Sequence, residues 1–204
     1  MEKIDFKKEY KNLYKAPTKQ PAIIKVPSLN YLMIDGQGSP GDSPAYQQAL
    51  QALYPVAYTL KFHSKQQLNR DYTVMPLQGL WWADDMDDFV NAKRDQWRWT
   101  LMIMQPDWIN RDTFQNALEK VRAKKKPTNL DKVRLEKLTE GQCAQILHIG
   151  PYADEHPTIM ALHQFVQSND GKLSQKHHEI YLSDPRKTAP EKLKTILRQP
   201  FVQH

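Results

Sequence analysis

The 204-residue sequence has one cysteine and no long apolar segment, and each absence excludes a class of protein. The single Cys143 excludes a disulfide within the chain and suits a reducing compartment. No apolar run is long enough to span a bilayer, and no apolar stretch follows the first basic residues as it would in a signal segment. These absences predict a cytoplasmic protein with no membrane partner.

Metal and nucleotide motifs are also missing. His177, His178 and Glu179 are consecutive, and neighbouring side chains of a strand diverge, so they cannot chelate one metal ion. The glycines in residues 36–38 lack the third glycine and the parallel β–α–β context of a dinucleotide site. The acidic cluster at residues 84–88 fits a solvated loop or helix start better than a cation site. We therefore expect neither a metal nor a cofactor.

The charge balance is basic, with 29 Lys and Arg against 23 Asp and Glu and a formal net charge of +6. The basic residues are dispersed over the N-terminal segment, residues 124–126 and the C-terminus. No helix-turn-helix, zinc spacing or RNA-binding signature accompanies them. We interpret the charge as a property of solubility and steering, and expect no specific nucleic-acid partner. Association with nucleic acid through the basic surface is a weaker alternative.

Two parts of the sequence repeat the same order of elements. The first has a strand at 31–36, a helix at 45–54 after Pro44, and extended runs at 57–62 and 72–77. The second has a strand at 144–150, a helix started by Pro157 that ends near residue 166, a short extended stretch at 172–173, and a strand at 178–182. The matching order of strand, turn, helix and paired strands predicts an internal duplication.

The remaining segments complete a single α+β domain with mostly antiparallel sheet. Residues 22–26 and 97–104 read as strands, 111–126 as an amphipathic helix capped by Asp112 or Thr113, and 190–197 as a short helix. We divide the chain into a leading segment (1–20), a first half (21–110), a connecting helix region (111–140) and a second half (141–204).

The strongest functional signal lies in residues 177–187. Alternation along this strand places Glu179 and Tyr181 on one face and Ile180 and Leu182 on the other. A carboxylate beside an aromatic ring on the inner face of a sheet is costly unless it is used. Glu179 could hold a cation, orient water or act as a general base. The alternative is an ion pair on an exposed sheet face.

Aromatic residues supply candidate walls for a planar or cationic ligand. All five tryptophans fall in one stretch, at positions 81, 82, 97, 99 and 108. Trp82 and Trp108, at strand ends, are candidate ligand contacts, and adjacent Trp81 should face away from Trp82. Trp97 fits core packing, and Trp99 is open to either interpretation.

Three further residues are candidate ligand contacts. Tyr152 follows the Gly150-Pro151 turn and could supply a ring and a hydroxyl at a pocket mouth. His148 precedes that turn, and its aliphatic neighbours favour a structural histidine. Tyr46, at the start of the first predicted helix, is a weaker candidate by symmetry.

The sequence resembles the GyrI-like small-molecule-binding proteins, in particular the branch that lacks a DNA-binding domain and includes cyclopropanoid cyclopropyl hydrolases. The resemblance covers about residues 20–204. It is carried by residues 145–152, 177–186 and 190–198 with Pro200, and less specifically by residues 79–82 and 100–108.

The resemblance implies two strand–helix–strand–strand modules related by a pseudo-two-fold axis, with helices on one face of the sheet and a ligand cleft between the halves. It implies a hydrophobic, aromatic or cationic ligand, and in some members an aromatic cage in which a cyclopropane is hydrolysed. Glu179 and Tyr181 would then be the catalytic residues. Two functions stay open: detoxification of xenobiotics by hydrolysis, and non-catalytic sequestration or regulation. The oligomeric state is not predicted.

Overall fold

The computed structural model describes residues 2–41, 43–83, 96–124 and 126–203, and the chain forms two compact units. Unit 1 comprises Met1–Phe6, Leu29–Met75 and Trp81–Leu138. Unit 2 comprises Lys7–Ser28, Pro76–Leu80 and Thr139–His204. Each unit therefore combines segments that are far apart in the sequence. The acidic cluster at residues 84–88 lies outside the described residues.

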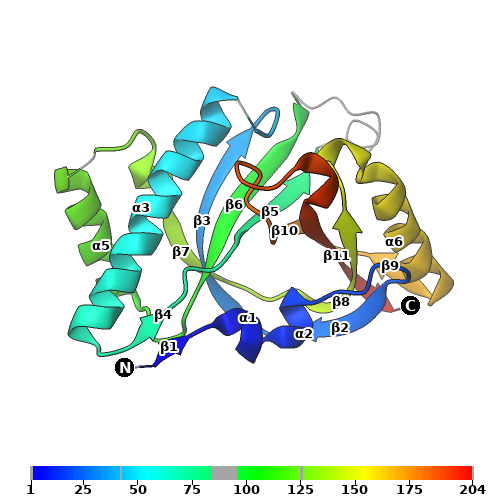
Figure 1. The fold of residues 1–204 in the computed structure, drawn as a ribbon, viewed down its shortest axis with the longest axis horizontal. Coiled ribbons are helices and arrows are strands. Elements are labelled where there is room, and N and C mark those ends of the chain that lie inside the picture. The colour runs from blue at the N-terminus through cyan, green and yellow to red at the C-terminus, as the bar shows by residue number, and fades with distance from the viewer. Residues whose placement is uncertain (1, 42, 84–95, 125, 204) are drawn as a thin grey trace. The chain divides into compact units, whose positions relative to one another are not determined.

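Unit 1 is a sheet with helices packed against it. The central strand is β3 (Leu29–Gln37), which pairs antiparallel with β6 (Arg98–Gln105) and β7 (Arg134–Leu138). Helix α3 (Pro44–Gln67) packs on β3 and β6 and against α5 (Arg111–Lys124) (Figure 1). The remaining elements are short: β1 (Lys3–Ile4), β4 (Asp71–Tyr72), η2 (Leu130–Lys132) and the last two residues of β5 (Leu77–Trp82).

Helix α3 is longer than the sequence indicated. Ser43 caps its start through a hydrogen bond from the Tyr46 N–H, and Pro44 is its first residue. The prediction of an extended run at 57–62 is wrong, because the helix continues through Pro55 to Gln67. Its buried residues recur every three or four positions (Ala49, Ala52, Leu53, Val56, Ala57, Leu60 and Ser64). This continuous apolar stripe outweighs the one backbone hydrogen bond that Pro55 cannot make.

Helix α5 confirms the predicted amphipathic helix but not its cap. The Thr113 N–H donates to Oδ1 of Asn110 over 2.9 Å, and the Phe114 N–H donates to the Asn110 carbonyl over 3.0 Å. Asn110 therefore accepts the hydrogen bonds of N–H groups in the first turn and is the cap. The prediction of Asp112 or Thr113 as the cap is wrong. The helix begins one residue later, at Arg111.

Unit 2 contains part of the nine-stranded sheet found among the described residues, in the order β2 (Ala22–Val26), β8 (Gly141–Ile149), β11 (Lys194–Gln203) and β10 (His177–Tyr181), followed by the Leu77–Leu80 part of β5. Helix α6 (His156–Ser168) packs along β8 and β11 (Figure 1). Short elements complete the unit: α1 (Phe6–Glu9) from Lys7 onward, α2 (Lys11–Tyr14), η3 (Tyr152–Asp154), β9 (Gly171–Leu173) and η4 (Pro190–Lys192).

A compact apolar core joins α6 to its sheet. Leu162 and Val166 of the helix are fully buried against Ile146 of β8 and Leu197 and Phe201 of β11. Each such side chain contributes roughly 1.5–3 kcal/mol by leaving water. This core fixes α6 over one face of the sheet, and the chain that leads into the helix is held close to the ends of β8 and β10.

The prediction of a helix at 190–197 is wrong. Only Pro190–Lys192 form a 3-10 turn, and β11 follows from Lys194. The strand pairs antiparallel with β8 on one side and β10 on the other, and it is buried from Thr195 to Phe201. Leu193, Ile196 and Leu197 recur at helical spacing in the sequence, but pairing with two neighbouring strands decides the conformation.

The repeated order of elements is present in the structure. Strand, helix and two paired strands occur as β3, α3, β5 and β6, and again as β8, α6, β10 and β11. The protein is thus an α+β protein with a large, mostly antiparallel sheet, as predicted. The predicted strand at 178–182 is found one residue earlier, at His177–Tyr181.

Candidate ligand-binding site

Glu179 and Tyr181 lie on the same face of β10, as their spacing predicts. The Tyr181 hydroxyl donates a hydrogen bond to Oε2 of Glu179 over 2.7 Å. The Glu179 side chain is 13% exposed, so its carboxylate is largely shielded from water but still accessible. Ile180, between them, is fully buried on the opposite face.

Neighbouring strands extend this face into a row of polar side chains. Thr195 of β11 stands opposite Tyr181, and His148 of β8 stands opposite Thr195. His148 is buried, and its Nδ1 shares a 3.0 Å hydrogen bond with the Thr158 hydroxyl of α6. We call this α6-covered face, carrying Glu179, Tyr181, Thr195 and His148, the Glu179 face.

Glu155 is a second carboxyl group beside the Glu179 face, and sequence reasoning missed it. It directly precedes α6, is 4% exposed, and its Oε1 has no hydrogen-bond partner among the described residues. Burial, and then repulsion by the charge of Glu179, raise its pKa to about 9, while a weaker contact with Thr195 opposes part of the rise. Glu155 is therefore a neutral acid at neutral pH.

Tyr152 covers one end of the Glu179 face. It belongs to η3 after the Gly150-Pro151 turn, and its ring meets that of Tyr181 edge-on at 5.7 Å between centroids. The ring is partly exposed, so an aromatic surface there is open to solvent. Burial, together with the nearby charges of Glu155 and Glu179, raises the pKa of its hydroxyl to about 12. Tyr152 is thus a neutral hydrogen-bond donor.

The Gly150 backbone allows this turn. Its φ of +144° is strained for other residues, and a Cβ there would stand 3.2 Å from Nε2 of His148. The glycine therefore lets the chain turn sharply above the imidazole, which brings Tyr152 and Glu155 back over the ends of β8 and β10.

At its other end, the Glu179 face carries two histidines. Nε2 of His177 lies 3.6 Å from Oε1 of Glu179, and the His177 ring meets that of His163 from α6 edge-on at 6.4 Å. Burial, and then the neighbouring His177, lower the pKa of His163 to about 4. His163 is therefore neutral at neutral pH and adds no charge to this end.

The opposite face of the same sheet carries a closed polar network. The His178 ring nitrogens bond to Glu140 Oε1 at 2.8 Å and to Gln78 Oε1 at 2.9 Å, and Gln78 donates to the Tyr14 hydroxyl. Arg198 pairs with Glu140 Oε2 at 3.3 Å. Burial alone would raise the pKa of Glu140, but His178 and Arg198 outweigh it and lower the pKa to about 2.

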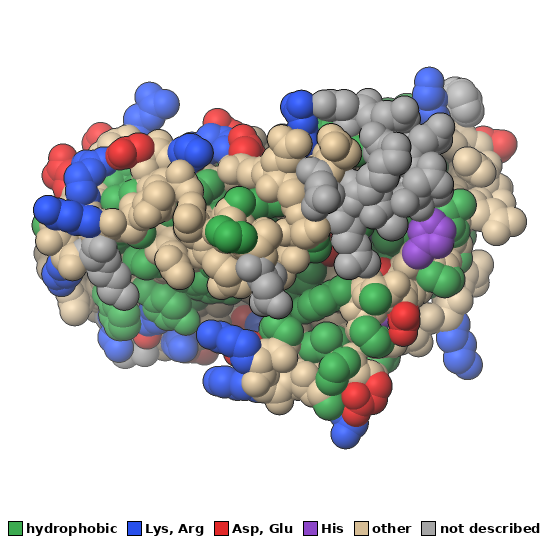
Figure 2. All heavy atoms as spheres, turned by 90° about the horizontal axis from the view of Figure 1, so that it is seen from above, with side chains coloured by type: hydrophobic (Ala, Val, Ile, Leu, Met, Phe, Trp, Pro, Cys, Tyr) green, Lys and Arg blue, Asp and Glu red, His purple; other side chains and the backbone are tan. Residues whose placement is uncertain are grey.

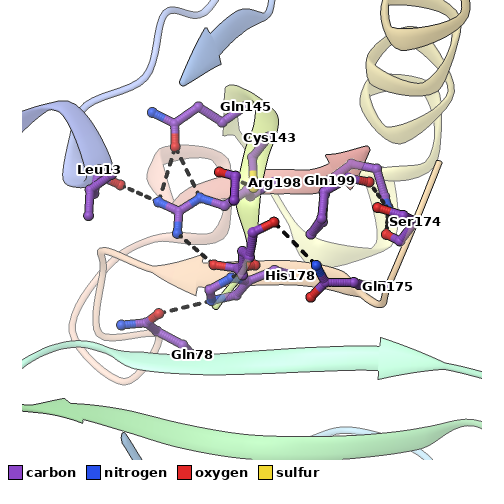
Figure 3. Close-up of polar contacts among 12 residues, drawn as sticks. Leu13, Gln78, Cys143, Gln145, Ser174, Gln175, His178, Arg198 and Gln199 are labelled. Carbon is purple, nitrogen blue, oxygen red and sulfur yellow. Dashed lines mark hydrogen bonds and ion pairs between the residues drawn. The ribbon is translucent and has the colours of Figure 1, made fainter. Parts of the chain in front are cut away.

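This network anchors the leading segment, because Arg198 also donates to the Leu13 carbonyl over 2.6 Å and to Gln145 (Figure 3). The polar groups of this network have their hydrogen-bond partners within the protein. We therefore interpret the network as stabilising unit 2 and not as binding a ligand. A separate hollow of about 320 Å³ opens beside it and is lined by Tyr10, Asn12, Leu13, Lys25 and Pro27.

The other predicted ligand contacts lie in unit 1. Trp99 is almost fully buried, donates through Nε1 to the Gly38 carbonyl over 3.2 Å, and meets the Tyr46 ring edge-on at 5.6 Å. Trp82, the last residue of β5, is partly buried. The structure thus brings Trp99 and Tyr46 together.

Trp108 lies elsewhere in unit 1. Its Nε1 donates to the Ser64 hydroxyl over 3.0 Å, the Arg70 guanidinium lies 5.0 Å from its ring, and the rings of Phe6 and Tyr72 surround it. Trp99 is the second residue of β6 and Trp108 follows the end of that strand, so the two lie near its opposite ends. One small ligand cannot contact both.

Within the described residues, no group of three or more His, Cys, Asp and Glu side chains is placed to hold a metal ion. None of the helices described is both long and apolar enough to cross a membrane. Lys and Arg side chains are dispersed among acidic ones on the described part of the face in Figure 2.

Comparison with known proteins places this arrangement in context. The chain is 43% identical to a solved structure described as an uncharacterized conserved protein from Listeria innocua, with a TM-score of 0.88 and coverage of 98% of this chain and 100% of that one. A structure described as a hydrolase from Listeria innocua has the same identity and coverage and a TM-score of 0.85.

A more distant likeness concerns the fold alone: the EcmrR C-terminal domain is 12% identical, with a TM-score of 0.59 over 91% of this chain and 98% of that one. No curated protein matches the chain. The GyrI-like small molecule binding domain matches residues 19–200, which is most of the sequence. The chain therefore belongs to the GyrI-like small-molecule-binding family.

Proposed function

We propose that the protein binds hydrophobic aromatic xenobiotics against the Glu179 face and hydrolyses cyclopropane-bearing alkylating compounds there. The observation that carries the proposal is the Tyr181–Glu179 hydrogen bond of 2.7 Å beside a partly exposed Tyr152 ring. It supports the proposal because a shielded carboxylate and a phenol hydroxyl lie together beside an aromatic surface, which suits a small aromatic ligand. The 43% identity to a structure described as a hydrolase supports the catalytic part.

The proposed reaction needs little from the protein. Glu179 accepts a proton from a water molecule whose oxygen bonds to a cyclopropane carbon. The strained carbon–carbon bond breaks, and its electron pair moves through the conjugated ring to the carbonyl oxygen, which becomes a phenolate. A tyrosine hydroxyl, from Tyr181 or Tyr152, stabilises that oxygen. Positioning by ring contacts and one proton transfer are sufficient, because ring strain already lowers the barrier.

The test is a single-turnover reaction of purified protein with a cyclopropane-bearing alkylator, followed by mass spectrometry. We expect a product heavier by one water and, for Glu179→Gln, a rate lower by roughly 10²–10⁴-fold, as for loss of a general base. Glu191→Gln, which alters an exposed glutamate of η4, is the matched control and should react like the wild type.

Two results would change the assignment. Recovery of unchanged ligand from a tight complex would identify a sequestering protein, the non-catalytic alternative. Equal rates for Glu179→Gln and Glu191→Gln would show that the reaction takes place elsewhere. The predicted roles of Trp82, Trp99, Trp108 and Tyr46 in ligand binding stay predictions, and His148 is proposed as a structural support of the Glu179 face through its bond to Thr158.

A further inference from the structure

The hollow beside the leading segment has no part in the proposed reaction. Its volume is about 320 Å³, and it is lined by three residues of the leading segment and two residues at the end of β2 (Tyr10, Asn12, Leu13, Lys25 and Pro27). All of them belong to unit 2, and α2 lies beside β2 (Figure 1). The volume is at the lower end of the range for small-molecule sites, so it suits a ligand of about two fused rings. We call it the Lys25 hollow.

Buried side chains of the sheet hold one wall of the Lys25 hollow in place. Helix α2 has four residues, and so short a helix is not stable by itself. The Arg198 guanidinium donates to the Leu13 carbonyl over 2.6 Å (Figure 3). The Gln145 amide donates to the Asn12 carbonyl over 2.8 Å. The wall is therefore organised before any ligand arrives, and a ligand loses little affinity to ordering it.

The same hydrogen bonds decide which polar groups are left to line the hollow. The carbonyls of Asn12 and Leu13 accept from the sheet, and the Tyr10 carbonyl accepts from the N–H groups of Leu13 and Tyr14. These three acceptors are thus satisfied within the protein. None of the lining side chains is acidic, and they offer an amide, an ammonium, a phenol ring and apolar surface.

The charge around the Lys25 hollow is positive. Residues 7–27 contain one acidic residue, Glu9, and six exposed lysines (Lys7, Lys8, Lys11, Lys15, Lys19 and Lys25). Lys25 lines the hollow and forms no ion pair with any residue that the structure describes. Ile23, two positions earlier on the same face of β2, is 44% exposed and places apolar surface next to the ammonium. The hollow therefore combines an uncompensated cation with apolar walls.

We propose that the Lys25 hollow is a ligand site of its own, and that it binds small aromatic anions. The rings of the ligand lie against Leu13, Pro27 and the Tyr10 ring. Its carboxylate pairs with the Lys25 ammonium and accepts a hydrogen bond from the Asn12 amide. An aromatic cation is repelled by the surrounding lysines, and a neutral ligand leaves Lys25 without a partner. This inference goes beyond the proposed function and does not depend on it.

The experiment is a titration at pH 7 followed by the amide chemical shifts of the isotope-labelled protein, because these shifts locate the ligand. Three probes share one ring system and differ in charge: 1-naphthoate, 1-naphthamide and 1-naphthylmethylammonium. From the affinity that small ligands gain per atom, we expect naphthoate to bind with a Kd on the order of 1 mM. The largest shifts should fall on residues 10–13 and 23–26. Naphthamide should bind about 2–5-fold more weakly, and the ammonium probe more weakly still.

Matched variants test the part played by the lysine. Lys25→Gln should lower the naphthoate affinity by about 2–5-fold and leave that of naphthamide unchanged. Lys25→Glu should reverse the order, so that the ammonium probe binds more tightly than naphthoate. Lys172→Gln removes the same charge from an exposed position of β9, which pairs with β11 and not with β2, and should bind as the wild type does.

Several results would overturn the inference. They are equal affinities of naphthoate and naphthamide for the wild type, shifts confined to residues 148–155 and 177–181, and no shift at about 10 mM naphthoate, well above the expected Kd. An unchanged order of affinities in Lys25→Glu would do the same. The wild-type titration decides even if a variant does not fold. None of these results alters the rate of Glu179→Gln against the alkylator, so the proposed function stands or falls separately.

Discussion

Two glutamates of the candidate site show how environment assigns different states to one residue type. Glu179 receives the Tyr181 hydroxyl at 2.7 Å, and its carboxylate is partly open to water. Glu155 is buried without a hydrogen bond to Oε1, which favours the neutral acid. Burial and the charge of Glu179 thus favour the neutral form of Glu155.

The neutral state of Glu155 predicts an unusual dependence of stability on pH. Because the pKa is raised in the folded protein to about 9, the folded state binds more protons than the unfolded one between the ordinary carboxyl range and that value. Its contribution is favourable below the unfolded pKa and is lost as pH rises toward 9. Glu155→Gln should therefore raise the free energy of unfolding at pH 8 by at least about 1 kcal/mol.

Urea denaturation of the wild type and Glu155→Gln at pH 5 and pH 8 measures this effect. The gain should be larger at pH 8 than at pH 5, while Glu191→Gln should change stability by no more than about 0.5 kcal/mol at either pH. An equal gain at both pH values would show that Glu155 is ionised in the folded protein. A gain of stability on replacing Glu155 would support the interpretation that this residue is kept for function.

At the residue scale, the sequence identifies Glu179 as a candidate site residue but does not identify Glu155. The alternation from His178 to Leu182 places Glu179 and Tyr181 on one face, which the hydrogen bond between them supports. Glu155 stands before a proline-started helix, where an acid reads as an ordinary partner of the helix dipole. Glu155 becomes a buried neighbour of Glu179 only because the chain folds back over β10, and no local sequence pattern predicts that arrangement.

Among the elements, the pairing of β3 with β6 depends on a close contact that only glycine allows. Gly36 stands directly opposite Trp99, and a Cβ on Gly36 would lie 2.1 Å from the end of the indole ring. The ring in turn is held by Tyr46 and by its hydrogen bond to the Gly38 carbonyl. The indole therefore packs over β3 at Gly36, where there is no side chain. The two residues form a cross-strand pair of an aromatic residue and a glycine.

Gly36→Ala should lower the free energy of unfolding by about 1–3 kcal/mol, because the added methyl overpacks a site that cannot yield. The same substitution in a Trp99→Leu background should cost much less, and a double-mutant cycle gives the coupling directly. Gln37→Ala, at the exposed neighbouring position, serves as the strand control. Equal costs of Gly36→Ala in both backgrounds would locate the strain in the backbone instead of the ring.

The two element-level errors share a physical cause. Residues 57–62 belong to α3 although Pro55 interrupts the helical pattern, and 194–203 form β11 although residues 190–197 read as a helix. In each case, tertiary contacts of the element decided the outcome. Burial of Val56, Ala57 and Leu60 outweighs a missing hydrogen bond, and pairing with β8 and β10 outweighs local helical spacing.

For the whole molecule, the duplicated order of strand, helix and two strands was predictable because turn residues and proline mark each element in both parts. The grouping of aromatic residues was not. Periodicity predicts which face of a strand a residue lies on but not which residues contact that face. The sequence therefore could not show that Trp99 contacts Tyr46 while Trp108 contacts Ser64. The ligand cleft between the halves remains a prediction.

The net charge of the whole chain predicts how salt should act on ligand binding. At +6, the protein repels an incoming monocation at long range, and dispersed basic side chains create no opposing patch on the face in Figure 2. In the proposed site, attraction of a cation by Glu179 would act at short range in a shielded place, where salt screens it weakly.

For tetraphenylphosphonium, an aromatic cation, bound against Glu179 as proposed, raising NaCl from about 0.02 to 0.3 M should leave the affinity unchanged or raise it by a few-fold, because it shortens the Debye length to a few ångströms. Binding of duplex DNA to the same protein, measured by fluorescence anisotropy, should instead be weak and fall by orders of magnitude, because it depends on counterion release. A steep loss of tetraphenylphosphonium affinity would locate the cation at exposed surface carboxylates, and a DNA complex that survives 0.3 M salt would favour nucleic acid as a partner. The opposite responses are expected from one charge distribution: positive overall, with the proposed binding carboxylate of Glu179 largely shielded from water.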